Sequence, residues 1–277
     1  MVSIGSPLPL GRFKFSVVRE IGRGGFGIVD EIKVLESNAS GTRSGTHLAR
    51  KRLNDNFATH PEARERFDRE IEQVRAMKHI DGVVNFRGQN VPGGTRFYVM
   101  PLYPNNLRSY LASCGIQPLQ NTARFCAAIA DTLVHAHALG FIHRDLKPEN
   151  ILLNDNNTHV VADWGLGYFM HQQSKVLIPL TRGGMGSEYY CSLEQWATGK
   201  CDQTGDVYSL GMMAAELVLG EQATLVYQGA GITVDLLPGN DRSSKLFNAA
   251  VRRMTNMVPH LRPQSMSDVA SELRALA

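Results

Sequence analysis

The chain has 277 residues, of which 43% are hydrophobic and 20% charged, and its formal net charge is +3. These values are typical of a globular protein and exclude the disordered and fibrous classes. The small positive charge is not gathered into a basic cluster, so we expect no nucleic acid and no membrane surface as a partner.

Cysteine usage and the N-terminal segment favour a cytoplasmic location. The four cysteines show no CxxC spacing, and a chain of this length does not need disulfides, so reduced thiols are expected. Residues 1–15 lack a basic leader followed by a long apolar run, so we expect no secretory signal. No stretch of the sequence has the apolar length of a membrane span.

The N-terminal third of the chain is predicted to form short strands separated by turns. Strands are expected over 15–21, 27–35 and 47–53. A helix follows over 61–78, and two further strands meet at the turn 91–94, which contains Pro and Gly. After Met100, long helical patterns alternate with one short hairpin that begins at Ile151.

These elements predict an α+β fold with two lobes in one domain over 13–277. The small N-lobe over 13–100 is β-rich with one helix, and the larger C-lobe over 107–277 is mainly α-helical. Residues 101–106, rich in Pro and Asn, join the two lobes as a hinge.

A glycine-rich segment joins the first two expected strands. Gly22, Gly24 and Gly27 form the pattern GxGxxG, whose glycines let backbone N–H groups approach phosphate oxygens. The residues after Gly27 continue as a strand, whereas a dinucleotide-binding fingerprint would open a helix there. The glycines therefore belong to a hairpin, for which a plain tight turn is the alternative interpretation. The candidate phosphate-binding residues are Ile21, Gly22, Arg23, Gly24, Gly25, Phe26, Gly27, Ile28 and Val29.

Lys51 is expected to face inward from the third strand. Strand alternation places it on one face with Ala49 and Leu53, and a buried ammonium group needs an anion. In the helix that follows, Glu70 lies on the inward stripe, where an unpaired acid is unusual. This stripe is formed by Phe67, Ile71, Val74 and Lys78. We expect a Lys51–Glu70 ion pair that holds the ammonium group against ATP phosphates; a surface lysine is the alternative.

The segment His143–Asn150 reads HRDLKPEN and carries the residue types that phosphoryl transfer requires. This reaction needs an aligned hydroxyl group and cations that offset charge on the transferring phosphoryl group. Asp145 would accept or orient the hydroxyl proton, and Lys147 would neutralise charge on the γ-phosphate. Asn150 and Asp163 supply oxygen ligands of the kind that Mg²⁺ prefers.

The glycine loop, Lys51, Glu70, HRDLKPEN and the later DWG triplet resemble, in this order, the eukaryotic-type (Hanks-type) protein kinase family, serine/threonine class. The resemblance runs from about Phe13 to the C-terminus. It implies the bilobal protein kinase fold, ATP and Mg²⁺ as cofactors, and a protein substrate. The adenine-binding residues that it implies are Ala49, Met100 and Tyr103.

The sequence departs from the family pattern in three places. Leu48 and Arg50 stand in the segment where the family has Val-Ala-Ile-Lys, and both lie on the strand face away from Lys51. Trp164 stands where the family has Phe, so we expect altered switching rather than lost chemistry. Residues 192–194 read Ser-Leu-Glu where Ala-Pro-Glu is usual. The resemblance implies that Glu194 pairs with Arg262, and that Asp206 braces the backbone of the catalytic segment.

Acceptor type and regulation also follow from the resemblance. Lys147 together with Ser187 favours serine or threonine as the acceptor. Arg144 before the catalytic aspartate is associated with control by a phosphate in the activation segment, since a phosphate would offset its charge. Ser174 and Thr181 are the candidate phosphorylation sites, with Thr181 preferred, and a segment that is never phosphorylated is the alternative.

Three functions remain open. The first is an active serine/threonine kinase, which self-associates for autophosphorylation. The second is a pseudokinase scaffold or binding module, which predicts a lost lysine, base or metal ligand, and none is lost. The third is a small-molecule phosphotransferase, which would lack the segment 186–194. A histidine metal site is not among them, since His135 and His137 face different directions on a helix and are read as packing or surface residues.

Overall fold

The computed structural model describes residues 14–24, 27–37, 42–89, 96–164, 187–220, 232, 236–237 and 239–277. These residues form two compact units, which we describe separately. Unit 1 contains the described residues within 1–78 and 84–103, and unit 2 contains those within 79–83 and 104–277. The lobe and hinge boundaries given above stay predictions.

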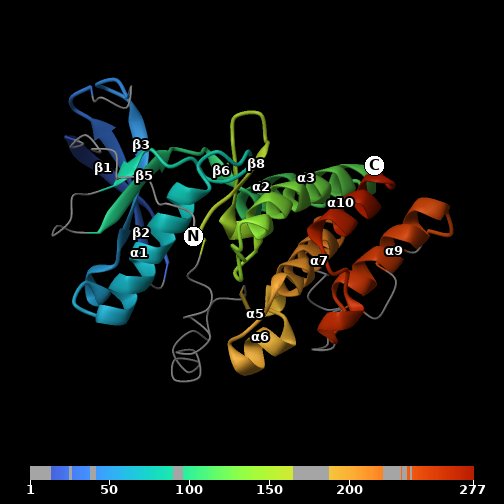
Figure 1. Ribbon diagram of the computed structural model, residues 1–277. Helices are drawn as coiled ribbons and strands as arrows, with labels where there is room; N and C mark the ends of the chain where they lie inside the picture. Colours follow the sequence, from blue (N-terminus) through green and yellow to red (C-terminus); the bar gives the residue numbers. More distant parts are fainter. Residues whose placement is uncertain are drawn as a thin grey trace. The chain divides into compact units, whose positions relative to one another are not determined.

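Unit 1 is a five-stranded antiparallel sheet with a long helix beside it (Figure 1). The strands, in the order β1-β2-β3-β5-β4, are β1 (Phe15–Arg23), β2 (Gly27–Val34), β3 (His47–Leu53), β5 (Phe97–Pro101) and β4 (Gly88–Gln89). The helical elements are the 3₁₀ turn η1 (Asp55–Phe57) and helix α1 (Pro61–Ala76). The first three strands confirm the sequence prediction, whereas the predicted turn 91–94 lies outside the described residues.

One face of this sheet carries a small apolar cluster. Its buried members are Ile32, Val34, Leu48 and Val99. The guanidinium group of Arg50 lies 5.1 Å from the ring centroid of Phe15 and 5.6 Å from that of Phe97. Its charge is paired with the buried carboxylate of Asp30. The arginine next to Lys51 in sequence is therefore satisfied on the opposite face of β3, as the alternation pattern predicts.

Helix α1 presents an apolar stripe with one acid in it. Pro61 occupies its first turn, where a missing N–H costs no hydrogen bond. The buried residues of the helix are Ala63, Phe67, Glu70, Ile71 and Val74. The helix ends at Ala76, and Met77 is buried while Lys78 is exposed. The expectation that Lys78 continues the stripe is wrong, because the backbone has left the helical path one residue earlier.

Unit 2 is mainly helical and includes a small three-stranded sheet in the order β6-β7-β8. Its strands are β6 (Asn105–Asn106), β7 (Ile151–Leu153) and β8 (His159–Val161). Its described helices are α2 (Leu107–Cys114), α3 (Leu119–Ala138), α5 (Ser187–Tyr190), α6 (Leu193–Thr198), α7 (Gln203–Leu219), α9 (Arg242–Met254) and α10 (Met266–Arg274), with the 3₁₀ turns η2 (Pro148–Asn150) and η3 (Pro259–Leu261). The predicted hairpin is confirmed as β7 and β8.

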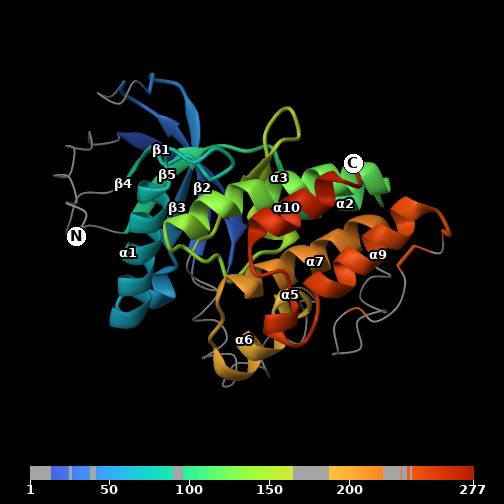
Figure 2. The same ribbon diagram turned by 45° about the vertical axis from the view of Figure 1, so that its right-hand side comes forward.

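Helix α7 forms the core of unit 2. Each of its residues from Thr204 to Val218 is buried, as expected for a helix surrounded by other elements. Helices α3, α5 and α9 pack against α7, and α10 lies along α3 (Figures 1 and 2). A carboxylate inside this helix, that of Asp206, therefore needs partners from the surrounding segments.

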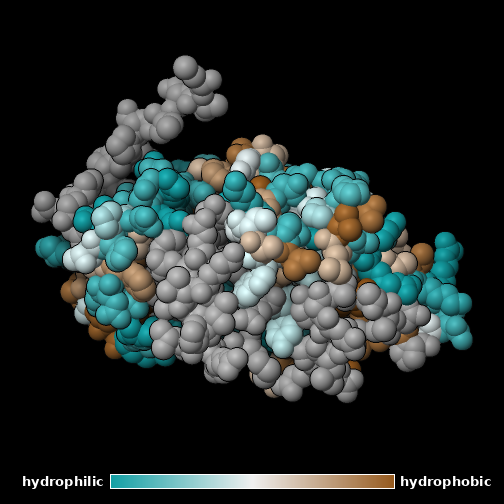
Figure 3. Space-filling view, turned by 90° about the horizontal axis from the view of Figure 1, so that it is seen from below, coloured by the Kyte–Doolittle hydropathy of each residue, from teal (hydrophilic) through white to brown (hydrophobic). Residues whose placement is uncertain are grey.

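The face of the molecule seen in Figure 3 has no single large apolar area among its coloured residues. Most of the coloured surface in Figure 3 is hydrophilic, and the hydrophobic residues on it are scattered. Among the helices that the structure describes, none is long and apolar enough to cross a membrane. All four cysteines are free thiols, as the sequence predicts.

Candidate active site

The first group of site residues lies in unit 1 around Lys51. Its ammonium nitrogen lies 2.7 Å from Oε1 of Glu70, and the same oxygen accepts a hydrogen bond of 2.9 Å from the Tyr98 hydroxyl. The side chains of Lys51 and Glu70 are 3% and 0% exposed. Strand register explains the third member, because Tyr98 of β5 is paired directly with Lys51 of β3. The predicted ion pair is thus present, with a tyrosine that sequence reasoning missed.

The glycine-rich segment forms a hairpin beside this lysine. Strands β1 and β2 are antiparallel, with Gly22 opposite Val29, and the N–H of Gly24 donates to the carbonyl of Gly27 at 2.8 Å. A Cβ atom at Gly27 would lie 3.0 Å from Cε of Lys51, so this position favours glycine. Gly25 and Phe26, also predicted to bind phosphate, lie outside the described residues. The hairpin prediction is confirmed, and phosphate binding stays a prediction.

The three predicted adenine-binding residues also belong to unit 1. Ala49 and Met100 lie opposite each other on β3 and β5, and both are buried. Tyr103 is half-buried, and this burial raises the pKa of its hydroxyl despite a hydrogen bond with the backbone of Asn85. The two strands therefore place small and flexible apolar side chains together, a surface of the kind that a flat aromatic ring contacts.

The second group of site residues lies in unit 2 around Asp145. The ammonium group of Lys147 lies 2.8 and 3.0 Å from the two carboxylate oxygens of Asp145. The amide nitrogen of Asn150 donates to the Asp145 backbone carbonyl at 2.7 Å and to its carboxylate at 3.0 Å. Burial alone would lower the pKa of Lys147, but the Asp145 carboxylate outweighs it and raises that pKa. Lys147 is therefore a cation beside the proposed base.

The donor set near Asp145 suits Mg²⁺. Both contacts made by the Asn150 amide nitrogen are to Asp145. The side-chain oxygen of Asn150 is therefore the atom suited to bind a cation. Asp163 adds a half-buried carboxylate and contributes to the field at Lys147. Among the described residues, no group of three or more His, Cys, Asp or Glu side chains could hold a metal ion. An amide oxygen with one carboxylate, completed by water and phosphate oxygens, is the coordination that Mg²⁺ prefers.

The backbone around this site is held in an unusual conformation. Arg144 and Asp163 have φ angles of +66° and +63°, in the left-handed region that non-glycine residues disfavour. The Asp206 carboxylate accepts the N–H of His143 at 2.9 Å and the N–H of Arg144 at 2.8 Å. The bracing role that the resemblance implied for Asp206 is present, and it offsets the strain at Arg144.

A histidine that sequence reasoning assigned to packing or surface contributes to the brace. Nε2 of His137 lies 2.8 Å from Asp206, and its side chain is 6% exposed. Burial acts to raise the pKa of Asp206, but the hydrogen bond with His137 and the backbone N–H groups hold it below its ordinary value. His135 is exposed, as expected. No sequence signal separates the two histidines, because the partner of His137 lies 69 residues away.

Trp164 packs against the catalytic segment. It is fully buried, its ring centroid lies 4.8 Å from that of His143, and its indole N–H donates to the Val161 carbonyl at 3.2 Å. The neighbouring His143 uses both ring nitrogens: Nε2 lies 2.8 Å from the Ala162 carbonyl, and Nδ1 accepts the Asp145 N–H at 3.2 Å. These partners fix His143 as the neutral tautomer with the proton on Nε2.

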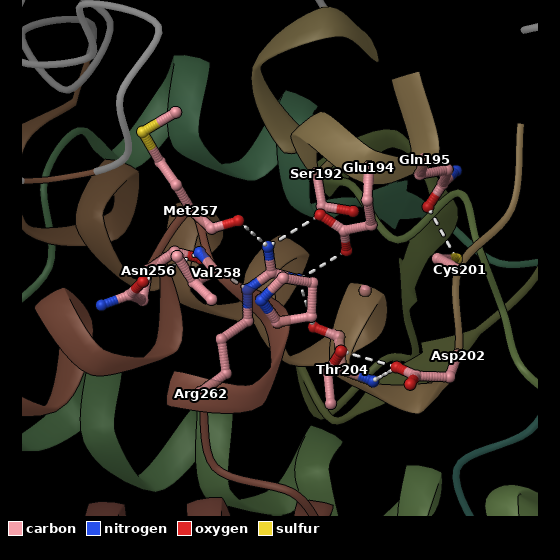
Figure 4. A network of polar contacts seen from close by, with 12 residues as sticks. Ser192, Glu194, Gln195, Cys201, Asp202, Thr204, Asn256, Met257, Val258 and Arg262 are labelled. Atoms are coloured by element: carbon pink, nitrogen blue, oxygen red, sulfur yellow. Dashed lines mark hydrogen bonds and ion pairs between the residues drawn. The ribbon is translucent and has the colours of Figure 1, made fainter. Parts of the chain in front are cut away.

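Glu194, in the first turn of helix α6, is bound by the buried guanidinium group of Arg262. Arg262 donates to both carboxylate oxygens of Glu194 at 2.7 and 2.9 Å, and its side chain is 0% exposed (Figure 4). It also donates to the backbone carbonyls of Asn256, Thr204 and Met257. The predicted Glu194–Arg262 pair is confirmed. The candidate phosphorylation sites Ser174 and Thr181 and the side chain of Ser187 lie outside the described residues.

Arg108 was missed because its partners lie far away in sequence. Its guanidinium group donates to Glu149 at 2.7 Å, to the Tyr190 hydroxyl at 2.8 Å and to Glu216, which also accepts from Tyr190. Glu149 belongs to HRDLKPEN, so this network ties the catalytic segment to α2, α5 and α7. Burial raises the pKa of Tyr190, which keeps its hydroxyl protonated.

An antiparallel sheet with one helix, a mainly helical unit and these two residue groups define a protein kinase domain. The sequence matches the protein kinase domain family over residues 15–268, and the chain therefore belongs to that family.

Curated relatives include kinases from bacteria and plants. The probable serine/threonine-protein kinase pknA2 of Bifidobacterium longum is 30% identical over 95% of this chain. The receptor-like kinase TMK2 of Arabidopsis thaliana is 31% identical over 76% of the chain, and the serine/threonine-protein kinase PknB of Mycobacterium leprae is 27% identical over 90%. The chain spans 35%, 23% and 41% of the lengths of these relatives.

Proposed function

We propose that this chain is an active protein kinase that transfers the γ-phosphate of ATP to serine or threonine hydroxyls of protein substrates. The observation that carries the proposal is the cluster of Asp145, Lys147 and Asn150, in which a base, a cation and an amide oxygen lie together. Family membership and the names of the curated relatives support the same reaction. The complete set of polar groups argues against a pseudokinase scaffold.

Each residue has a distinct role in this proposal. Asp145 accepts or orients the proton of the attacking hydroxyl group, and Lys147 offsets the charge on the γ-phosphate. Lys51, held by Glu70, contacts the phosphates together with the hairpin of residues 21–29. Ala49, Met100 and Tyr103 contact the adenine ring, with 101–106 as the hinge.

Asn150 and Asp163 would hold Mg²⁺. When bound, this ion offsets the negative charge that develops on the transferring phosphoryl group. The protein contributes one amide oxygen and one carboxylate, so phosphate oxygens and water complete the coordination. The strained backbone at Asp163 is the kind of feature that clusters at functional sites.

Regulation, partners and location are further parts of the proposal. A phosphate on Thr181 or Ser174 would offset the charge of Arg144. Self-association would allow one copy to phosphorylate another. Four free thiols suit a reducing cytoplasm, where ATP is also available.

The test is transfer from ATP with Mg²⁺ to a peptide library that contains Ser, Thr and Tyr acceptors, with mass spectrometric mapping. Asp145→Asn removes the base without changing its shape, and we expect a loss of at least about a hundredfold. Lys51→Met removes the phosphate contact, with an expected loss of about a hundredfold or more. Label should appear on serine and threonine.

Two matched controls make the same chemical changes at exposed positions. The controls are Asp155→Asn, at an exposed residue in the turn between β7 and β8, and Lys33→Met, at an exposed residue of β2. Both should retain wild-type transfer. Equal incorporation by wild type, Asp145→Asn and Lys51→Met would rule out the mechanism, and label on tyrosine alone would rule out the acceptor class.

A further inference from the structure

Arg144, the residue before the proposed base, is held at both its backbone N–H and its backbone carbonyl. The N–H of Arg144 donates to Asp206, and the carbonyl of Arg144 accepts a hydrogen bond of 2.6 Å from the amide nitrogen of Gln195. That carbonyl belongs to the peptide bond that leads into Asp145. Because φ at Arg144 is +66°, the backbone there needs external contacts to keep this conformation. Gln195 therefore contacts the carbonyl oxygen of the residue that precedes Asp145.

The orientation of the Gln195 amide is determined by a second contact. Gln195 is 1% exposed, and its Oε1 accepts from the thiol of Cys201 at 3.0 Å (Figure 4). Burial raises the pKa of Cys201 to about 12, so the thiol keeps the proton that it donates. A flipped amide would place oxygen against the Arg144 carbonyl and leave the thiol without an acceptor. Cys201 thus selects the orientation that donates to Arg144.

The fold makes room for this arrangement at the start of α7. A Cβ atom at Gly205 would lie 2.8 Å from Sγ of Cys201 and 3.4 Å from Oε1 of Gln195. The helix can approach the thiol this closely because the position is glycine. Gln195 also follows Glu194, whose ion pair with Arg262 fixes the first turn of α6. The Glu194–Arg262 pair and the Cys201 thiol therefore locate the amide.

We propose that Gln195 is a positioning residue for phosphoryl transfer. It holds the Arg144 carbonyl and thereby fixes the direction in which the Asp145 side chain points. Cys201 in turn orients the side-chain amide of Gln195. This inference rests on the proposed function, in which Asp145 orients the hydroxyl of the acceptor. Gln195 itself touches neither substrate nor nucleotide in this role.

The kinetic test uses Gln195→Met, which keeps the length of the side chain and removes both hydrogen bonds. We expect kcat to fall about tenfold, since a buried carbonyl loses its donor, while the KM for ATP stays unchanged. Cys201→Ser keeps a donor to Gln195 and should retain the wild-type kcat, whereas Cys201→Ala removes the donor and should lower kcat. Gln203→Met removes an amide contact to the Gln264 carbonyl on the same unit and is the matched control.

A second measurement does not depend on activity. Hydrogen exchange of the amides over 143–146, followed by mass spectrometry, should be faster in Gln195→Met and unchanged in Gln203→Met. Wild-type kcat and wild-type exchange in Gln195→Met would overturn the proposal, as would a raised KM with unchanged kcat. If Gln195→Met does not fold, equal kcat in Cys201→Ala and Cys201→Ser overturns it. Faster exchange in a protein whose wild type transfers no phosphate would contradict the proposed function and leave the Gln195 contact supported.

Discussion

The positions of several site residues are determined by partners that lie far away in the sequence, so local sequence patterns do not reveal them. Lys51 and Glu70 could be paired from the sequence because each sat on an apolar face, where an isolated charge is costly. Tyr98 could not, because strand order is needed before its position opposite Lys51 is known. His137 and Gln195 show the same limit, since their partners lie 69 and 51 residues away.

The buried His159 makes stability depend on pH. It lies on β8, with Nε2 2.9 Å from the Thr132 hydroxyl, and burial lowers its pKa from 6.5 to about 4, against a small opposing effect of Asp131. The unfolded chain takes up a proton as the pH falls through about 6.5, whereas the folded chain does so only near about 4. Stability should therefore fall across this window, by up to about 3 kcal/mol.

Urea unfolding of wild type and His159→Gln at pH 7, 5.5 and 4 checks this expectation. Glutamine does not titrate, so the variant should be less stable than wild type at pH 7 and should lose less stability on acidification. Parallel curves for the two proteins would show that His159 is not the group responsible.

At the scale of elements, the ends of helices were predicted less well than their existence. The sequence located α1, yet its final residue was misplaced because Met77, rather than Lys78, turns inward once the helix has ended. The two-residue strand β6 was read as part of a connector, because its pairing with β7 is a tertiary contact. The elements that carry motifs were located best from the sequence, because their glycines, lysine and acids identify the position of each element in the fold.

The Arg262 guanidinium joins α6, α7 and the segment before η3, so its removal should be costly. Arg262→Met leaves the partly exposed Glu194 carboxylate and three backbone carbonyls without their donor, and we expect a loss of about 3 kcal/mol. Arg253→Met breaks a pair with Glu272 in which the arginine is 59% exposed, and should cost less than about 1 kcal/mol. Urea unfolding of both variants makes the comparison, and similar losses would contradict it.

For the molecule as a whole, the sequence predicted the family, the two-part α+β fold and the order of the site residues. The match over residues 15–268 agrees with the range from Phe13 onward inferred from the motifs. What the motifs did not contain is the set of contacts that hold them, such as the Arg108 network. Those contacts join helices through pairs up to 108 residues apart, and only the packed fold brings them together.

Nucleotide binding should stabilise the whole chain against heat. A non-hydrolysable ATP analogue with Mg²⁺ at about a hundred times its Kd should add about 2.7 kcal/mol, seen as a higher Tm. Excess EDTA should reduce the shift, because the proposed ligands Asn150 and Asp163 lose their ion. Asp163→Asn should behave as the wild type does in EDTA, and Asp155→Asn should keep the full shift. An EDTA-independent shift would contradict the proposed metal site.

The packing of Trp164 against His143 also gives the catalytic segment a fluorophore of its own. The chain has two tryptophans, and the other, Trp196, is half-buried on α6. Replacing Trp196 with phenylalanine would leave all indole emission at one place, directly after Asp163 in the chain. The intensity and wavelength of that emission would then follow events at the proposed metal ligand in real time, without an attached dye.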